Sequence, residues 1–151
     1  MTKTASILVP VDGSAQAMHA LDMAMDFAAS LSAELVICHV VDLAQAAAMA
    51  GGQAQLVPGC LKELENEGKS LLEAALARAG GRVPASIRLA EGVVPEQIDR
   101  LAAEIHPYFI VIGTHGRSGF NRLVMGSVAE HVVRAASVPV MVIPPRLEHA
   151  A

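Results

Sequence analysis

Glycine, hydroxyl and basic residues concentrate between residues 113 and 128 of the 151-residue chain. Glycines in a loop permit positive φ angles and let the backbone approach a ligand closely. Gly126 and Ser127 fall where a helix is expected to begin, and the free N–H groups and positive dipole end of a helix start attract anions. Arg117 would add positive charge and the Ser127 hydroxyl a donor. The segment therefore predicts a phosphate-binding loop, whose candidate residues are Gly113, His115, Gly116, Arg117, Gly119, Gly126, Ser127 and Val128.

Two further candidates follow apolar runs nearer the start of the chain. Asp12 comes directly after the run 6–11, and a carboxylate there can accept hydrogen bonds from ribose hydroxyls. Val40 lies near the end of the run 33–41, where it could line an adenine pocket. Each candidate also has a plainer interpretation: a helix cap for Asp12, core packing for Val40, and simple turns for the glycines. His115 is likewise either a ribose or phosphate contact or an exposed loop histidine.

Short apolar runs rich in branched residues precede these candidates, and such runs are typical of strands buried on both faces of a parallel sheet. The expected strands span residues 6–11, 33–41, 85–90, 108–112 and 138–143. Apolar residues at helical spacing predict helices after a Ser14 cap, over 61–79, from Pro95 to about 105, and over 127–136. Residues 43–60 lack a clear period and are expected to form a long loop, with a helical turn at 43–49.

Five strands alternating with four helices predict one α/β domain over residues 1–151, built on a doubly wound, Rossmann-like parallel sheet. Ligands of such sheets lie beyond the carboxyl ends of the strands, where the strand order reverses. We therefore expect the first and fourth strands to flank the ligand crevice. That arrangement would bring Asp12 and the segment 113–128 to the same place.

Composition narrows the class of protein. Hydrophobic residues make up 53% of the chain and charged residues 17%, which excludes a disordered chain. A net charge of −4 and an aromatic content of 3% argue against nucleic acid as the partner. The sequence shows no apolar stretch typical of a membrane span or signal peptide, and two cysteines cannot build a disulfide framework. These features predict a cytoplasmic protein that binds neither nucleic acid nor membranes.

The glycine spacing separates the classes of phosphate-binding protein. A dehydrogenase places GxGxxG at its first strand–helix turn, but that turn here reads Val11-Asp12-Gly13-Ser14. A P-loop needs Gly-Lys followed by Ser or Thr, and no lysine occurs after Lys69. The same absence weakens a phospho-receiver interpretation.

Two motifs together resemble the universal stress protein family. They are Val9-Pro10-Val11-Asp12-Gly13-Ser14 and Gly113-x2-Gly116-x9-Gly126-Ser127, and the second matches the family's nucleotide-binding pattern G-x2-G-x9-G-[S/T]. The resemblance covers nearly the whole chain and implies a 3-2-1-4-5 parallel sheet and a homodimer. For the ATP-binding branch it implies adenine and ribose contacts from Pro10, Val11, Asp12 and Val40. It implies ribose and phosphate contacts from Gly113, Gly116, Gly126, Ser127 and Val128, and Arg117 and Gly119 also resemble the usual loop.

The expected function is that of an ATP-binding universal stress protein, with or without Mg²⁺, which acts in a stress response through the nucleotide-dependent state of a homodimer. The sequence shows no paired carboxylates, catalytic triad or placed general base, so we expect a binding protein rather than an enzyme. A slow ATP hydrolase and a partner-binding module without nucleotide are the alternatives.

The apolar last strand, Val138–Ile143, is expected to end the sheet. An unprotected apolar edge invites pairing with another chain, and Pro139 and Pro144 limit that pairing without abolishing it. We expect a symmetric homodimer through this edge. The alternative is a short edge strand in a monomer.

Overall fold

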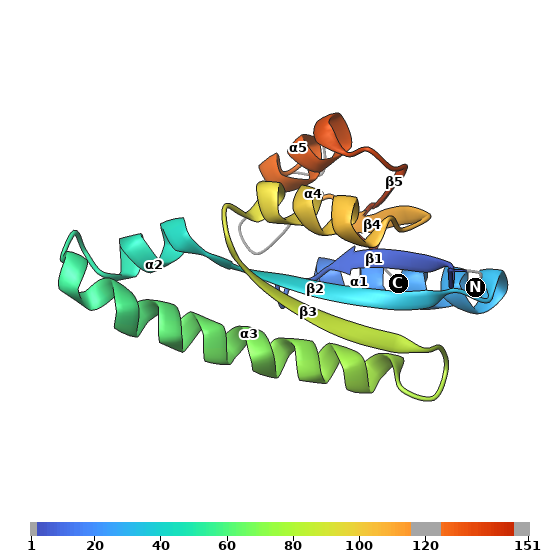
Figure 1. Cartoon of the computed structure of the whole chain (residues 1–151), viewed down its shortest axis with the longest axis horizontal. Coiled ribbons are helices and arrows are strands. Elements are labelled where there is room, and N and C mark those ends of the chain that lie inside the picture. The colour runs from blue at the N-terminus through green and yellow to red at the C-terminus, as the bar shows by residue number, and fades with distance from the viewer. Residues whose placement is uncertain (1–2, 116–124, 147–151) are drawn as a thin grey trace, which may run out of the picture.

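A sheet of five parallel strands runs through the computed structural model, which describes residues 3–115 and 125–146. The strands are β1 (Ser6–Pro10), β2 (Glu34–Asp42), β3 (Ala85–Gly92), β4 (Phe109–Gly113) and β5 (Val140–Ile143). The helices are α1 (Ala15–Leu31), α2 (Leu43–Met49), α3 (Val57–Ala79), α4 (Val94–Ile105) and α5 (Ser127–Ala135), with a 3₁₀ turn, η1, at Ala54–Leu56. The strand order β3-β2-β1-β4-β5 confirms the predicted doubly wound sheet (Figure 1).

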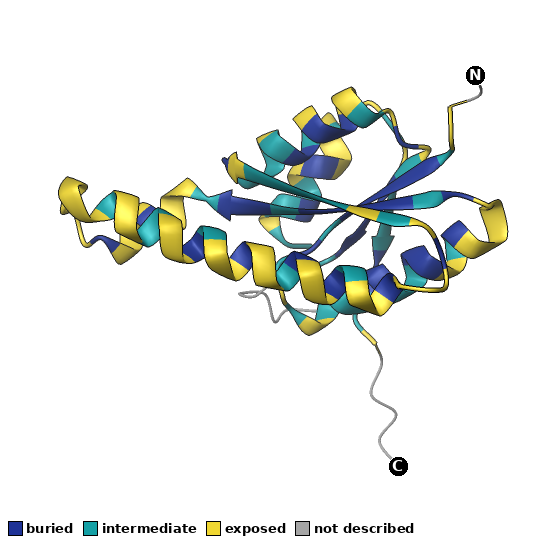
Figure 2. Ribbon diagram, turned by 60° about the horizontal axis from the view of Figure 1, so that its bottom comes forward, coloured by how far each residue is buried: buried dark blue, intermediate teal, exposed yellow. Residues whose placement is uncertain are grey.

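The central strands are buried on both faces because helices cover each side of the sheet (Figure 2). Alternate residues of β1 point to opposite sides: Ile7 and Val9 pack with α1 and α3, and Leu8 packs with α4 and α5. Cys38 of β2 lies on the side of α4 and is fully buried, and this burial raises the pKa of its thiol to about 12. The thiol therefore stays protonated at neutral pH and packs as a small apolar side chain.

The loop expected over residues 43–60 is wrong for most of its length, because this stretch contains α2, η1 and the start of α3, whereas the helical turn expected at 43–49 is present as α2. Asp42 caps α2 by accepting a hydrogen bond from the Ala44 N–H at 2.9 Å. Ala46 is buried in a small cluster with Val41. Alanine is the best helix former, but an alanine-rich stretch offers little contrast between polar and apolar faces, so its helix has a weak periodic signal. The described residues therefore contain five α-helices where four were expected.

Other expected elements are present with shifted ends. The last strand was expected over 138–143, but it spans Val140–Ile143. The helix expected from residue 61 begins at Val57, and Pro58 fits its first turn because an N–H there has no partner within the helix. Among residues 3–115 and 125–146, no helix is long and apolar enough to cross a membrane.

Gly68 marks the place where α3 packs on His39 of β2. A Cβ atom at Gly68 would lie 2.7 Å from His39 Cδ2 and 3.0 Å from Leu89 Cδ1. We predict that Gly68→Ala lowers the free energy of unfolding by about 1–3 kcal/mol, the usual cost of overpacking, although alanine has the better helix propensity. Gly59 on the same helix has nothing within 4 Å of such a Cβ. Gly59→Ala is therefore expected to raise the free energy of unfolding by up to about 1 kcal/mol. Urea denaturation of both variants checks the opposite signs, and a stabilised Gly68→Ala protein would contradict the packing argument.

Candidate functional site

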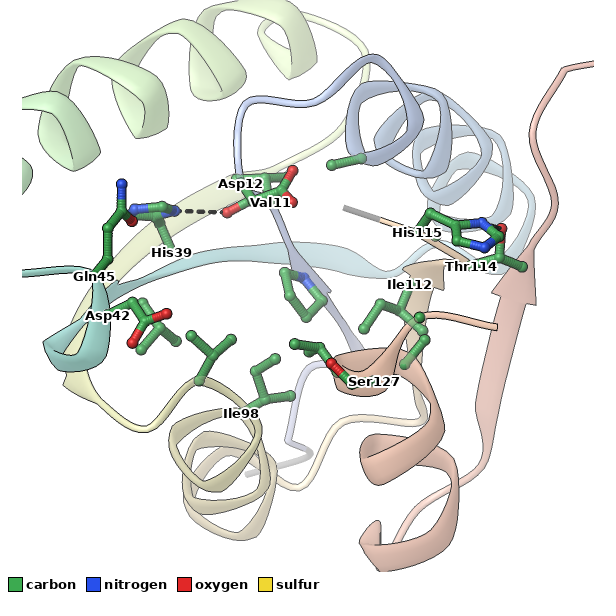
Figure 3. Close-up of a pocket in the computed structure, with 18 residues that line it drawn as sticks. Val11, Asp12, His39, Asp42, Gln45, Ile98, Ile112, Thr114, His115 and Ser127 are labelled. Atoms are coloured by element: carbon green, nitrogen blue, oxygen red, sulfur yellow. Dashed lines mark hydrogen bonds between the residues drawn. The ribbon is translucent and has the colours of Figure 1, made fainter. Parts of the chain in front are cut away.

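A cavity of about 470 Å³ opens at the carboxyl ends of β1, β2 and β4 (Figure 3). Helix α4 and the first turn of α5 complete its walls. Because β1 and β4 are neighbours and the chain order reverses between them, the cavity lies at the position expected for a ligand of this fold. Nine predicted site residues line it: Pro10, Val11, Asp12, Val40, Gly113, His115, Gly126, Ser127 and Val128. The predicted residues Gly116, Arg117 and Gly119 lie outside the described residues.

Asp12 shapes the turn between β1 and α1. Its Oδ1 accepts a hydrogen bond from the Ser14 N–H at 2.9 Å. Ser14 in turn caps α1, because its Oγ accepts a hydrogen bond from the Ala17 N–H at 3.1 Å. Gly13 between them has φ +84°, a left-handed conformation that favours glycine. The helix cap is therefore Ser14, as expected, and Asp12 lies two positions closer to β1 with its side chain in the cavity wall.

His39 fixes the end of β1 from the neighbouring strand. Its Nδ1 lies 2.7 Å from the Val11 carbonyl oxygen (Figure 3). Since a carbonyl can only accept, Nδ1 carries the proton and donates. The His39 side chain is half-buried and also lines the cavity.

Gly126 is required by a close backbone contact rather than by its φ angle, which is −62°. Its N–H donates to the Thr114 carbonyl oxygen at 2.6 Å, and a Cβ atom on Gly126 would lie 2.9 Å from that oxygen. Gly113 also lacks a positive φ, and a Cβ there would make an ordinary contact, 3.4 Å from the Gln16 carbonyl oxygen. Neither glycine adopts the positive φ angle that its residue type permits, whereas a close backbone approach is present at Gly126. We call the pair Thr114 and Gly126 the loop neck.

Helix α5 begins at the cavity. Gly126 is its N-cap residue and has no side chain with which to cap the helix. The first intrahelical bond runs from the Glu130 N–H to the Gly126 carbonyl at 2.9 Å, so the amides of Ser127, Val128 and Ala129 precede it. All three residues line the cavity. Amides at a helix start, together with the positive end of the helix dipole, form a site suited to an anion.

His115 is buried, and the expectation of an exposed loop histidine is wrong. The residue is only 7% exposed, and Figure 3 shows its ring beside Thr114. The Nδ1 atom lies 3.0 Å from Thr114 Oγ1. The Nε2 atom has no hydrogen-bond partner among the described residues. His115 lines the cavity, but its contact with ribose or phosphate stays a prediction.

Helices α4 and α5, which form one wall of the cavity, are joined by a polar pair. His131 Nε2 of α5 lies 3.5 Å from Asp99 Oδ2 of α4. Burial raises the pKa of Asp99, and the nearby His131 partly offsets that rise. Asp99 directly follows Ile98, which lines the cavity.

Four polar residues of the cavity wall were missed from the sequence: His39, Asp42, Gln45 and Thr114. Asp42 ends the second apolar run as Asp12 ends the first, so the same positional argument would have found it. The wall also contains the apolar side chains of Val94, Ile98 and Ile112. No group of three or more His, Cys, Asp or Glu side chains within the described ranges could hold a metal ion.

A doubly wound sheet with a pocket at the reversal of strand order is typical of α/β proteins that hold a small ligand beyond their strand ends. Residues 4–144 match the model of the universal stress protein family, and the chain belongs to this family. Universal stress protein MJ0531 of Methanocaldococcus jannaschii is 34% identical over 138 residues, which cover 91% of this chain and 80% of that protein.

Solved structures agree with this assignment. A family member from Burkholderia pseudomallei is 38% identical, with a TM-score of 0.71 over 93% of this chain and 96% of its own. The structure of hypothetical protein MJ0577 has a TM-score of 0.82 at 23% identity, over 95% of this chain and 97% of its own. The likeness to MJ0577 is one of fold.

Two further structures of the same fold contain adenine nucleotides. A universal stress protein in complex with cAMP has a TM-score of 0.69 at 24% identity, over 94% of this chain and 98% of its own. A universal stress protein from Archaeoglobus fulgidus in complex with dAMP has a TM-score of 0.60 at 22% identity, over 94% of this chain and 98% of its own. Adenine-nucleotide binding is thus a property of structural neighbours of this chain.

Proposed function

We propose that this chain binds ATP in the cavity and acts as a regulatory protein in a stress response, not as an enzyme. The observation that carries the proposal is that one cavity joins the amide-rich start of α5 to the carboxylate of Asp12 and to an apolar wall. These three features suit, in order, the phosphates, the ribose and the base of a nucleotide.

Each part of the nucleotide has its proposed partners. Pro10, Val11 and Val40 flank the base, and Asp12 accepts hydrogen bonds from ribose hydroxyls. Gly113, Gly126, Ser127 and Val128 surround the ribose and phosphates, and we propose that Gly116, Arg117 and Gly119 add further phosphate contacts. Mg²⁺, where present, would be held chiefly by the phosphates, since the described residues offer no cluster of ligands for it.

We also propose that the chain forms a homodimer through the open edge of β5. We propose the cytoplasm as its location. The carbonyls of Pro139 and Ile143 accept hydrogen bonds from the β4 side at 2.9 and 3.2 Å. Because backbone groups alternate sides along a strand, the N–H and C=O groups of Val140 and Val142 point to the open edge. An apolar strand with such unpaired groups can pair with its copy.

Thermal unfolding of the whole chain with millimolar ATP, ADP or AMP tests the proposal. Ligand at about 100 times its Kd should stabilise the fold by roughly 2.7 kcal/mol, which corresponds to a rise of about 5–10 °C in Tm for a domain of this size. No rise with any of the three nucleotides would contradict the proposal and favour a module that binds a protein partner. Phosphate release above background that is lost in Asp12→Ala would instead favour slow ATP hydrolysis.

A further inference from the structure

The cavity has two chemically different sides. The start of α5 supplies amides on one side, and the end of β2 with α4 forms the other (Figure 3). Figure 3 shows Asp42 on the β2 side, with Ile98 between it and Ser127. If the phosphates bind at α5, the β2 side receives the base. The inference below therefore rests on the proposed function.

Asp42 is an acidic residue of the cavity wall on the β2 side. It is the last residue of β2, and its Oδ1 accepts the Ala44 N–H at 2.9 Å as the cap of α2. This bond uses one of the two carboxylate oxygens. The Oδ2 atom makes no hydrogen bond or ion pair with any residue in the described ranges. A carboxylate can only accept, so Oδ2 favours a donor on the ligand and disfavours an acceptor.

No polar side chain near Asp42 in this wall favours an acceptor on the ligand over a donor. His39 donates its Nδ1 proton to the Val11 carbonyl, so this donor is already used. Gln45 is exposed, and its amide offers both a donor and an acceptor, which suits either kind of ligand edge. Val40 and Ile98 contribute only apolar surface from their side chains.

We propose that Asp42 determines base specificity, by selecting a nucleobase with an exocyclic amine and rejecting one with a carbonyl at the same position. Adenine presents an N6 amine, which can donate to Oδ2. Guanine and hypoxanthine present an O6 acceptor, which faces the carboxylate with like polarity. Specificity of this kind depends as much on the repelled partner as on the favoured one, because a charged acceptor left unpaired is costly.

Inosine triphosphate is the matched probe, because it differs from ATP in carrying O6 in place of N6 and a proton on N1. Isothermal titration of the whole chain with both triphosphates measures the ratio of their Kd values. We expect ATP to bind at least about 10-fold more tightly than inosine triphosphate, the lower end of what one good hydrogen bond to a charged group provides. The Asp42→Asn protein is expected to narrow the ratio to about threefold or less, because its amide can donate to O6.

Asp42→Asn keeps the cap of α2, since asparagine is as good an N-cap residue as aspartate. Asp42→Ser also keeps a capping oxygen while it removes the charge, and it is expected to narrow the ratio in the same way. Glu73→Gln is the matched control, because Glu73 is an exposed acid of α3 that does not line the cavity. It removes one negative charge and is expected to leave the ratio unchanged.

Equal affinity of the unaltered chain for the two triphosphates would overturn the role of Asp42 while leaving the proposed function intact. An unchanged ratio in both Asp42 variants would do the same. Binding of neither triphosphate would overturn the proposed function, and the specificity inference with it.

Discussion

A Gly126→Val protein is expected to lose ATP binding while it keeps its fold. The first side-chain atom would lie 2.9 Å from the Thr114 carbonyl oxygen, so the loop neck must open and the start of α5 must shift. The amides that we propose to hold the phosphates would then be misplaced. Each hydrogen bond to a charged oxygen contributes about 1.5–3 kcal/mol, so losing two of them lowers the affinity by about 100-fold or more. Isothermal titration with ATP measures the loss, and circular dichroism checks the fold.

Gly59→Ala is the control for this prediction. A Cβ at Gly59 would have nothing within 4 Å, and Gly59 does not line the cavity, so this variant is expected to fold and bind ATP like the unaltered chain. Unchanged ATP affinity in a folded Gly126→Val protein would refute the assignment of the phosphates to α5.

A Val142→Pro protein is expected to be a monomer. Proline has no N–H, and the N–H of Val142 is one of the groups that point to the open edge of β5. The backbone groups that face β4 belong to the residues on either side, so the sheet within each chain is expected to persist. Light scattering coupled to size exclusion should give the mass of one 15.7 kDa chain for this variant and twice that mass for the unaltered protein.

Val142→Thr keeps the N–H and the β-branched shape, and it is expected to stay dimeric. A dimer of undiminished stability in Val142→Pro would place the interface elsewhere on the molecule, and a monomeric unaltered chain would refute the dimer itself.

The strands were predictable because burial on both faces leaves a continuous apolar run. The sequence Ile7-Leu8-Val9 shows this, since its neighbours pack on opposite sides of the sheet and none needs to be polar. Helix α2 was not predictable in the same way. Its residues are mostly alanines, and only Ala46 is buried. The sequence therefore has a high helix propensity but no clear apolar face.

The site was predictable where it depends on position in the chain. Asp12 and Ser127 line the cavity because one follows a strand and the other begins a helix, and local patterns reveal both. The burial of His115 and the contact of Gly126 with Thr114 depend on how distant segments meet, which no local pattern encodes. Gly126 illustrates the limit: its type was informative, but the reason for it is steric contact and not the φ angle that the pattern suggested.

The 2.6 Å bond across the loop neck has a practical consequence for engineering. It means that Thr114 and Gly126, on either side of the segment 116–124, adjoin in space. A guest domain needs such an insertion point when its own two ends adjoin, as in a circularly permuted fluorescent protein. Insertion between residues 120 and 125, beyond the proposed phosphate contacts Gly116, Arg117 and Gly119, is expected to leave the five strands intact. It is also expected to couple the fluorescence of the guest to the nucleotide concentration, which would turn the chain into a genetically encoded sensor.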